Sequence, residues 1–235
     1  MIDCHCHILP GLDDGPQTME ESLEMARIAA DEGIDRIIAT PHVTDAGPSP
    51  EVIATRVNEF NLLLQEKTIP VQVFPGAEAA SGLTPALFSR HTLNRASYVL
   101  IEFPHDHLPS YAKNILQWLI AKGLRPVIAH PERNYSIIRS PETLLNILDK
   151  DIHIQITGAS ILGNYGRDIQ LCAYFLLDSG NVDIIASDAH GEKIRPPMLS
   201  AARDAAARRL GKKAADRLVT TNPAAVLNGE AMDTR

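Results

Sequence analysis

The sequence predicts a single α/β domain with a mainly parallel sheet, spanning residues 1–235. Short segments rich in Ile and Val alternate with segments of helical periodicity along the whole chain. Hydrophobic residues make up 45% of the chain, which is typical of a globular protein with a sizeable core. The length of 235 residues suits one domain, because single α/β barrels commonly run to roughly 200–250 residues.

Seven segments are expected to be strands, because each is short, rich in β-branched residues and bounded by Gly, Pro or charged residues. Two of them, RIIAT and DIIA, are nearly continuous apolar runs, as expected for strands buried on both faces. In chain order the predicted strands are Ile2–His7, Arg36–Thr40, Val71–Phe74, Tyr98–Phe103, Pro126–Ala129, Ile152–Ile156 and Asp183–Ser187.

Helical patterns fill most of the gaps between these strands. The first opens with Thr18, and Glu21 three residues later predicts a capping box. Gly33, Gly123 and Gly180 stand where helices should stop. Strands that alternate with helices imply a parallel sheet, either open or closed into a barrel. The expected helices are Thr18–Glu32, Pro50–Glu66, Tyr111–Lys122, Pro141–Lys150, Arg167–Ser179 and Pro197–Leu210.

Charge and composition exclude several classes of protein. The net charge is −7 with scattered basic residues, which argues against nucleic-acid binding because such proteins cluster their basic side chains. Three cysteines, Cys4, Cys6 and Cys172, give no disulfide framework. The start MIDCHCHILP has no basic region and no long apolar stretch, so it is not a signal peptide. No segment approaches the ~20 apolar residues that span a bilayer. We therefore expect a cytoplasmic protein without direct membrane insertion.

Imidazole and carboxylate side chains gather at the carboxyl ends of six of the seven predicted strands. In parallel α/β folds these ends converge on one face, where sites form. Such ligands suit manganese, iron or zinc, and their number exceeds the needs of one ion. Side chains alternate along a strand, so we expect His5 and His7 on one face and Cys4 and Cys6 on the other. The residues at the strand ends are His5, His7, His42, Glu78, Glu102, His130, Asp188 and His190.

Other kinds of site fit the sequence less well. A zinc site built on the thiolates of Cys4 and Cys6 would need a turn in place of a strand, and a second cysteine pair to complete it. There is no GxSxG elbow and no P-loop. A cysteine phosphatase of the HCx5R type needs an Arg six residues after its nucleophile, and none of the three cysteines is followed by one.

Together these motifs resemble the polymerase and histidinol phosphatase (PHP) superfamily, and within it the bacterial tyrosine-protein phosphatases of capsule and exopolysaccharide operons. The resembling stretches run from residue 2 to residue 195: IDCHCHILPGLDDGP, ATPHV, PGAE, IEFP, AHPER, and SDAH followed by Arg195. The resemblance implies a distorted seven-stranded β/α barrel that holds three divalent metal ions. Manganese is the expected metal, with iron or zinc as alternatives.

Carried over by position, the resemblance also implies nine metal ligands. His5, His7, Glu78 and Asp188 would hold the first ion; Glu78 would bridge to a second, shared with Glu102 and His130; Asp14, His42 and His190 would hold the third. Asp13 stays open as an alternative to Asp14, because Asp and Gly are favoured in turns such as GLDDGP for conformational reasons alone.

Four further residues have expected roles beside these ligands. Arg133 and Arg195 are the expected catalytic residues, because the planar guanidinium fork matches phosphate. The alternative for both is an ordinary surface ion pair. His105 and His107 follow Glu102 in a loop. One hypothesis is that they shape the approach of the substrate or donate a proton late in the reaction. The alternative is that they are only solvated loop residues.

The resemblance implies hydrolysis of protein phosphotyrosine, on the tail of a tyrosine kinase that regulates polysaccharide export. A phenolate has a conjugate pKa near ~10, so it needs less help from a general acid than an alkoxide does. One alternative is a small-molecule phosphoesterase resembling histidinol phosphatase. Another is a non-catalytic or proofreading module of a polymerase, which the chain length disfavours. The oligomeric state, including a homo-oligomer, is left open.

Overall fold

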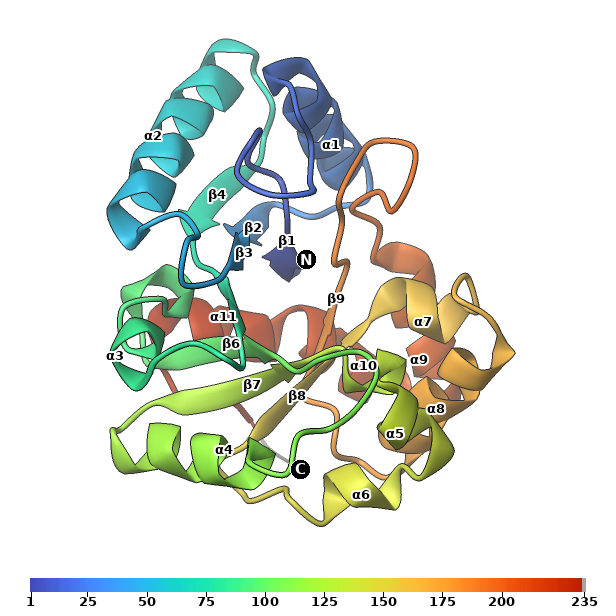
Figure 1. Ribbon diagram of the computed structural model, residues 1–235. Coiled ribbons are helices and arrows are strands. Elements are labelled where there is room, and N and C mark those ends of the chain that lie inside the picture. The colour runs from blue at the N-terminus through green and yellow to red at the C-terminus, as the bar shows by residue number, and fades with distance from the viewer. Residues whose placement is uncertain (234–235) are drawn as a thin grey trace.

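The computed structural model describes residues 1–233, which form an α/β fold with parallel strands in two sheets (Figure 1). This confirms the predicted α/β class with parallel strands. The three-stranded sheet has the order β1 (Ile2–Cys6), β2 (Arg36–Ala39) and β4 (Gln72–Pro75). The six-stranded sheet has the order β3 (His42–Val43), β5 (Glu78–Ala80), β6 (Tyr98–Glu102), β7 (Arg125–Ala129), β8 (His153–Thr157) and β9 (Ile184–Ala186).

The two sheets are linked but are not one closed seven-stranded sheet. All seven predicted strands are present, and β3 and β5 are short continuations of β2 and β4. One break falls at Thr40-Pro41, where the proline has no N–H to donate to a neighbouring strand, and the other falls at Gly76-Ala77. A Cβ on Gly76 would lie 2.6 Å from Cγ2 of Ile38, so the backbone of Gly76 packs directly against the Ile38 side chain. On the other side, one isolated bridge between Cys6 and Ala189 joins β1 to the segment after β9.

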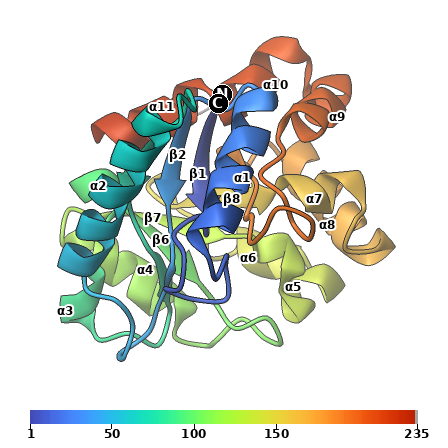
Figure 2. The ribbon, with the colours of Figure 1, turned by 90° about the horizontal axis from the view of Figure 1, so that it is seen from above.

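Helices cover the outer faces of both sheets. In Figures 1 and 2, α1 (Met19–Asp31) and α2 (Pro50–Glu66) lie beside the three-stranded sheet. The capping box at Thr18 and Glu21 is present, and α2 has the predicted bounds. The other predicted helices are α4 (Ala112–Ala121), α6 (Glu142–Leu145), α8 (Arg167–Asp178) and α9 (Ser200–Leu210).

The predicted helix Pro141–Lys150 is mostly wrong, because only α6 is helical there. The chain turns at Asn146, and Asp149 O accepts a hydrogen bond from Ile152 N in a second turn that leads into β8. Several short elements were not predicted: α3 (Pro85–Phe88), η1 (Leu93–Arg95), η2 (Pro131–Arg133), α5 (Tyr135–Arg139), α7 (Gly158–Leu162), α10 (Lys212–Val219) and α11 (Thr221–Asn228).

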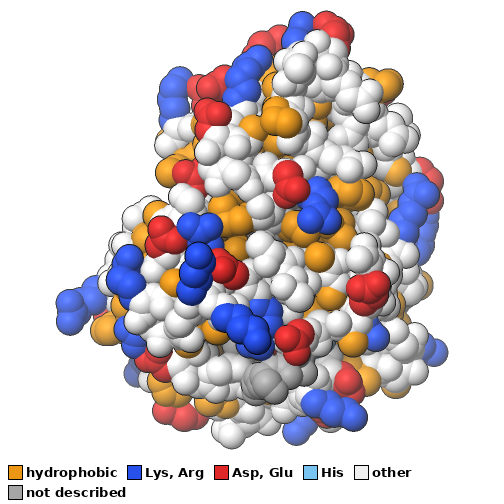
Figure 3. All heavy atoms as spheres, turned by 180° about the vertical axis from the view of Figure 1, so that it is seen from behind, with side chains coloured by type: hydrophobic (Ala, Val, Ile, Leu, Met, Phe, Trp, Pro, Cys, Tyr) orange, Lys and Arg blue, Asp and Glu red, His pale blue; other side chains and the backbone are white. Residues whose placement is uncertain are grey.

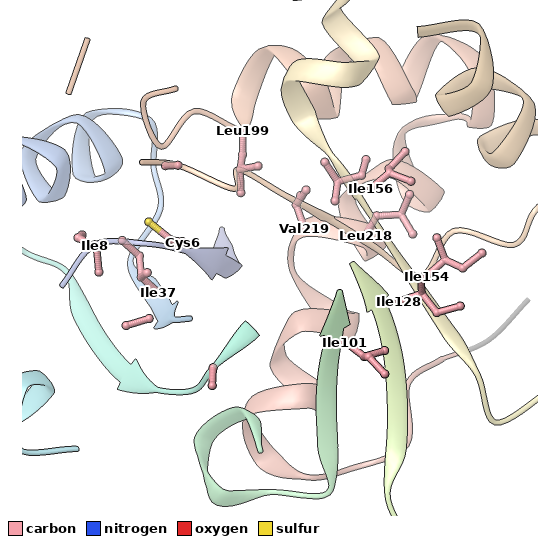
Figure 4. Packing of buried hydrophobic residues seen from close by; sticks show 14 of the residues in the cluster. Cys6, Ile8, Ile37, Ile101, Ile128, Ile154, Ile156, Leu199, Leu218 and Val219 are labelled. Carbon is pink, nitrogen blue, oxygen red and sulfur yellow. The ribbon is translucent and has the colours of Figure 1, made fainter. Parts of the chain in front are cut away.

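Alternate residues of the strands pack into two separate apolar clusters. Ile101, Ile128 and Ile154, on three neighbouring strands, belong to the outer cluster beneath the helices (Figure 4). Leu100 and Val127 belong to the inner cluster, which also contains the apolar side chains of α11. The two strands for which burial on both faces was predicted follow the same pattern, because Ile37 and Ile185 belong to the outer cluster and Ile38 and Ile184 to the inner one.

Helix α11 covers the end of the fold where the strands begin. Tyr98 and Arg125, at the starts of β6 and β7, both donate hydrogen bonds to Glu230 O just after this helix. Cys4 Sγ lies 3.8 Å from Pro223 O. The carboxyl ends of the strands therefore remain the open end, where a site can form.

Lys, Arg, Asp and Glu side chains are intermixed on the face seen from behind in Figure 3. Across residues 1–233, no helix has both the length and the apolar character needed to cross a membrane.

Candidate metal centre

The nine predicted metal ligands lie together at the carboxyl ends of the strands. Together with His105 they form five groups, and the possible ligand atoms of each group lie within 4.8 Å of one another. The groups are His5, His7 and Glu78; His5, His130 and Asp188; His42, Glu78 and Glu102; Glu102, His105 and His130; and His7, Asp14, His42 and His190.

Glu78, from β5, lies at the centre of these groups. Its Oε1 is 2.9 Å from Nε2 of His130. Its Oε2 lies 3.2 Å from Nε2 of His5, 3.3 Å from Nε2 of His7 and 3.0 Å from Nδ1 of His42. This oxygen is buried and makes no hydrogen bond, although it is surrounded by nitrogen atoms. A buried carboxylate oxygen in this position needs a cation as its partner.

Two hydrogen bonds determine which nitrogens of His5 and His7 face the centre. Nδ1 of His5 lies 2.8 Å from Oε1 of Gln155, and Nδ1 of His7 lies 2.6 Å from Oδ2 of Asp13. Both partners are acceptors, so each Nδ1 carries a hydrogen, and in the neutral ring each Nε2 has the free lone pair. These two Nε2 atoms are 3.2 Å apart and face each other. Two opposed lone pairs beside a carboxylate are the donor set of a divalent metal ion.

The adjacent aspartates Asp13 and Asp14 have different positions. Asp13 accepts hydrogen bonds from Nδ1 of His7 and from the backbone N–H groups of Gly15 and His42, so it orients these residues. Asp14 Oδ1 lies 3.5 Å from Nε2 of His42 and 3.4 Å from Nε2 of His190. Only Asp14 has its carboxylate among the ligand atoms.

The two loop histidines also differ. Nε2 of His105 lies 3.5 Å from Oε1 of Glu102, and its ring stacks on His130 at 5.5 Å between centroids. His105 is therefore a ligand candidate beyond the nine predicted. His107 instead pairs with Asp106, at 2.8 Å on the exposed surface, and belongs to none of the five groups.

Both predicted arginines contact the centre through Asp188. Arg133 Nη1 and Arg195 Nη2 each donate a hydrogen bond to Oδ2 of this buried carboxylate. The other oxygen, Oδ1, lies 3.4 Å from Nε2 of His5. The arginine side chains are only 18% and 23% exposed, so these are not ordinary surface ion pairs.

The charges of the centre are strongly coupled. Burial alone would lower the pKa of His5, but Glu78 and Asp188 outweigh it and raise the pKa to about 10. Burial of His42 is outweighed in the same way by Glu78, and its pKa rises to about 9. Burial would raise the pKa of Glu78, yet His5 and His130 lower it well below its usual value. The carboxylates thus stabilise positive charge in the centre, and protons or metal ions can supply that charge.

Three residues of the centre have backbone conformations that side chains rarely adopt. His130, Asp188 and Arg195 have φ values of 29°, 51° and 58°. Such conformations cost of order 1–3 kcal/mol each and cluster at functional sites. His130 turns the chain sharply just after β7 and Asp188 does so just after β9, while Arg195 lies further along the loop that follows β9.

Sequence reasoning missed several residues that support the centre. Gln155 is a polar residue within the apolar strand β8, and that contrast could have singled it out. Asp3 joins β1 to the end of β9, because it accepts hydrogen bonds from N and Oγ of Ser187. Asp13 was considered only as an alternative to Asp14. Tyr165, beside the two arginines, had no signal in the sequence.

The cysteines take no part in any of the five ligand groups of residues 1–233. The expectation that Cys4 and Cys6 share one face is wrong, because Cys4 packs in the inner cluster and Cys6 in the outer one. The cause is a register shift in β1 between Asp3 and Cys6, which interrupts the alternation of side chains.

A cleft adjoins the centre, with a volume of about 460 Å³. It lies between the loop containing Asp14 and Gln17 and the loop from His190 to Arg195, so it opens beside the predicted ligands. Ile194, on the second loop, is 80% exposed.

Comparison with known proteins identifies relatives over nearly the whole chain. The family described as capsular polysaccharide synthesis, CpsB/CapC, matches residues 1–228. Tyrosine-protein phosphatase YwqE of Bacillus subtilis is 41% identical over 201 residues, covering 83% of this chain and 79% of YwqE. Tyrosine-protein phosphatase CpsB of Streptococcus agalactiae is 29% identical over 240 residues, covering 97% and 98%.

Solved structures agree with these relatives. One from the crystallographic work on YwqE of Bacillus subtilis and CpsB of Streptococcus pneumoniae, described as unique metal-dependent tyrosine phosphatases, has 35% identity and a TM-score of 0.95. It covers 100% of this chain, and this chain covers 97% of it. A β-aspartyl dipeptidase of Fervidobacterium islandicum has 14% identity and a TM-score of 0.59. The match covers 100% of this chain and 77% of the dipeptidase, and it shows a shared fold alone.

Proposed function

The chain belongs to the CpsB/CapC family of capsular polysaccharide synthesis, and from that premise we propose how its centre acts on phosphotyrosine. It is a metal-dependent tyrosine-protein phosphatase, a hydrolase of phosphoric monoesters. The observation that carries this function is the set of imidazole and carboxylate groups around Glu78, in a family whose named members are tyrosine-protein phosphatases.

We infer that the centre holds three divalent ions, with manganese as the resident metal. The first ion would be bound by His5, His7, Glu78 and Asp188. The second would be bound by Glu78, Glu102 and His130, and the third by Asp14, His42 and His190. The unpartnered oxygen of Glu78 and the opposed nitrogens of His5 and His7 support this donor set. Ions bound there supply Lewis-acid chemistry, activating water and offsetting the charge of the phosphate.

Arg133 and Arg195 bind the phosphoryl group in this proposal. Their guanidinium groups converge on one oxygen of Asp188, so a phosphate near this carboxylate meets donors from both. A carboxylate oxygen and a phosphate oxygen accept the same guanidinium N–H groups, so both side chains already have the geometry that the substrate requires. The burial of both arginines strengthens these contacts, because water screens them less.

The cleft beside the centre receives the peptide around the phosphotyrosine. We infer that the substrate is a phosphotyrosine-containing protein of capsule synthesis, a polysaccharide-export tyrosine kinase, met in the cytoplasm. We further infer that the chain is one domain and that the two linked sheets act as one distorted barrel. The bridge between Cys6 and Ala189 supports this, because it joins β1 of the three-stranded sheet to the segment after β9 of the six-stranded sheet.

Comparing turnover on a phosphotyrosine peptide and on histidinol phosphate tests this function against its nearest alternative. We expect kcat/KM for the peptide to exceed that for histidinol phosphate by at least about 100-fold, because a pocket that fits one leaving group leaves polar groups unpaired with the other. A preference for histidinol phosphate would contradict the proposal and identify a small-molecule phosphoesterase.

A further inference from the structure

Tyr165 lies in the short loop between α7 and α8, against both arginines of the centre. The guanidinium carbon of Arg133 is 5.1 Å from the centroid of its ring. Burial would lower the pKa of Arg195, but the neighbouring Asp188 and Tyr165 raise it above its usual value. The hydroxyl of Tyr165 and Nε of Arg195 are both buried, and neither makes a hydrogen bond.

Two guanidinium groups that approach a single carboxylate oxygen repel each other. The face of an aromatic ring is negative, so the ring of Tyr165 stabilises the charge of Arg133 where it stands. Arginine is a long side chain with many rotamers, and a stacked ring excludes most of them. The tyrosine therefore offsets the repulsion and also limits the rotamers that Arg133 can adopt.

We propose that Tyr165 is a positioning residue that holds Arg133 and Arg195 ready as a phosphate-binding pair. This rests on the proposed function for the identity of the substrate, but the binding of phosphate itself can be measured separately. Tyr165 does not belong to the five metal-ligand groups, so its removal leaves the metal content unchanged.

The test compares Tyr165→Leu and Tyr165→Phe with the wild-type, metal-loaded protein. Tyr174→Leu is a matched control, because the guanidinium carbon of Arg209 lies 4.2 Å from the centroid of the Tyr174 ring. Arg209 pairs with Asp178, away from the centre. Four quantities are measured: metal content, melting temperature, the Kd for inorganic phosphate, and KM and kcat for a phosphotyrosine peptide.

We expect Tyr165→Leu to weaken inorganic phosphate binding and raise KM about tenfold, with normal metal content, as loss of a partly buried cation–π contact implies. Tyr165→Phe keeps the ring and should stay within about threefold of wild type. In an Arg133→Lys background, Tyr165→Leu should have a much smaller effect, because the two residues act together.

Wild-type phosphate affinity in Tyr165→Leu, or an undiminished effect in the Arg133→Lys background, would overturn the proposal. If Tyr165→Leu does not fold, Tyr165→Met, which keeps most of the volume without the ring, is judged by the same criteria. A wild-type protein that binds phosphate but does not hydrolyse the peptide would refute the proposed function. In that case the Kd for phosphate alone decides the role of Tyr165.

Discussion

At the scale of the residue, two polar side chains outside the proposed ligand set determine which nitrogens of His5 and His7 face the centre. Gln155 and Asp13 accept hydrogen bonds from Nδ1 of His5 and His7, and so direct both Nε2 atoms to the centre. Partners of this kind typically change metal affinity by about 10–100-fold when they are removed.

Gln155→Met keeps the volume of the side chain but removes the acceptor for Nδ1 of His5. We expect metal affinity to fall about 10–100-fold while the fold survives. Metal titrations of this variant decide the matter, with Gln65→Met on the exposed surface of α2 as the control. His5→Ala, which removes the ligand itself, sets the largest loss to be expected. Wild-type affinity in Gln155→Met would mean that the orientation of His5 does not depend on this hydrogen bond.

Arg133→Lys and Arg195→Lys keep the charge beside Asp188 but lose the planar fork. If the arginines bind the transferring phosphoryl group, each substitution should lower kcat/KM by an amount equivalent to ~1.5–3 kcal/mol of transition-state stabilisation, with normal metal content. Steady-state kinetics on a phosphotyrosine peptide measure this loss. Unchanged kcat/KM in both variants would leave the arginines with only their ion pair to Asp188.

The three cysteines should be inert. Burial raises the pKa of all three thiols, that of Cys172 to about 12, so the reactive thiolate scarcely forms at pH 8. We expect iodoacetamide to leave activity unchanged. Loss of activity with the metals still bound would indicate cysteine chemistry instead.

The sequence predicted the residues that line the centre better than the residues that hold them in position. His5, Glu78 and Asp188 stand at strand ends, so the rule that such ends converge was sufficient to bring them together. Gln155 and Tyr165 act only through other side chains, and no spacing along the chain indicates which side chain meets which.

At the scale of the element, the strands followed their sequence signals closely and the short helices did not. Strands such as β2 and β9 are almost fully buried, and that produces clear apolar runs. Helices such as α7 and α11 have only five and eight residues, too few for a periodic pattern to be recognised. The breaks that create β3 and β5 depend on contacts between strands, such as that of Gly76 with Ile38.

The capping box of α1 provides a test at this scale. Oγ1 of Thr18 accepts a hydrogen bond from Glu21 N, and the Glu21 carboxylate accepts one from Thr18 N. Thr18→Ala should lower the free energy of unfolding by roughly 0.5–2 kcal/mol without changing metal content. Chemical denaturation measures the loss, and Thr55→Ala within α2 serves as the control. Equal stability of the two variants would show that the cap contributes little.

At the scale of the whole molecule, two linked sheets carry the centre at one end and are closed by α11 at the other. The α/β class followed from the sequence, but the division into sheets of three and six strands did not. That division reflects interruptions of two residues in strands that otherwise continue, and local propensity does not reveal them. The open end collects the nine predicted ligands and His105 from the ends of six predicted strands and the loops that follow them, which no single element could provide.

The central claim is that phosphotyrosine hydrolysis depends on metals bound by this cluster. The most direct measurement is to titrate the protein with a chelator and determine both bound metal and phosphate release from a phosphotyrosine peptide in the same samples. We predict that activity falls in step with the bound metal and returns when Mn²⁺ is added back. Full turnover by protein stripped of its metal would contradict the account.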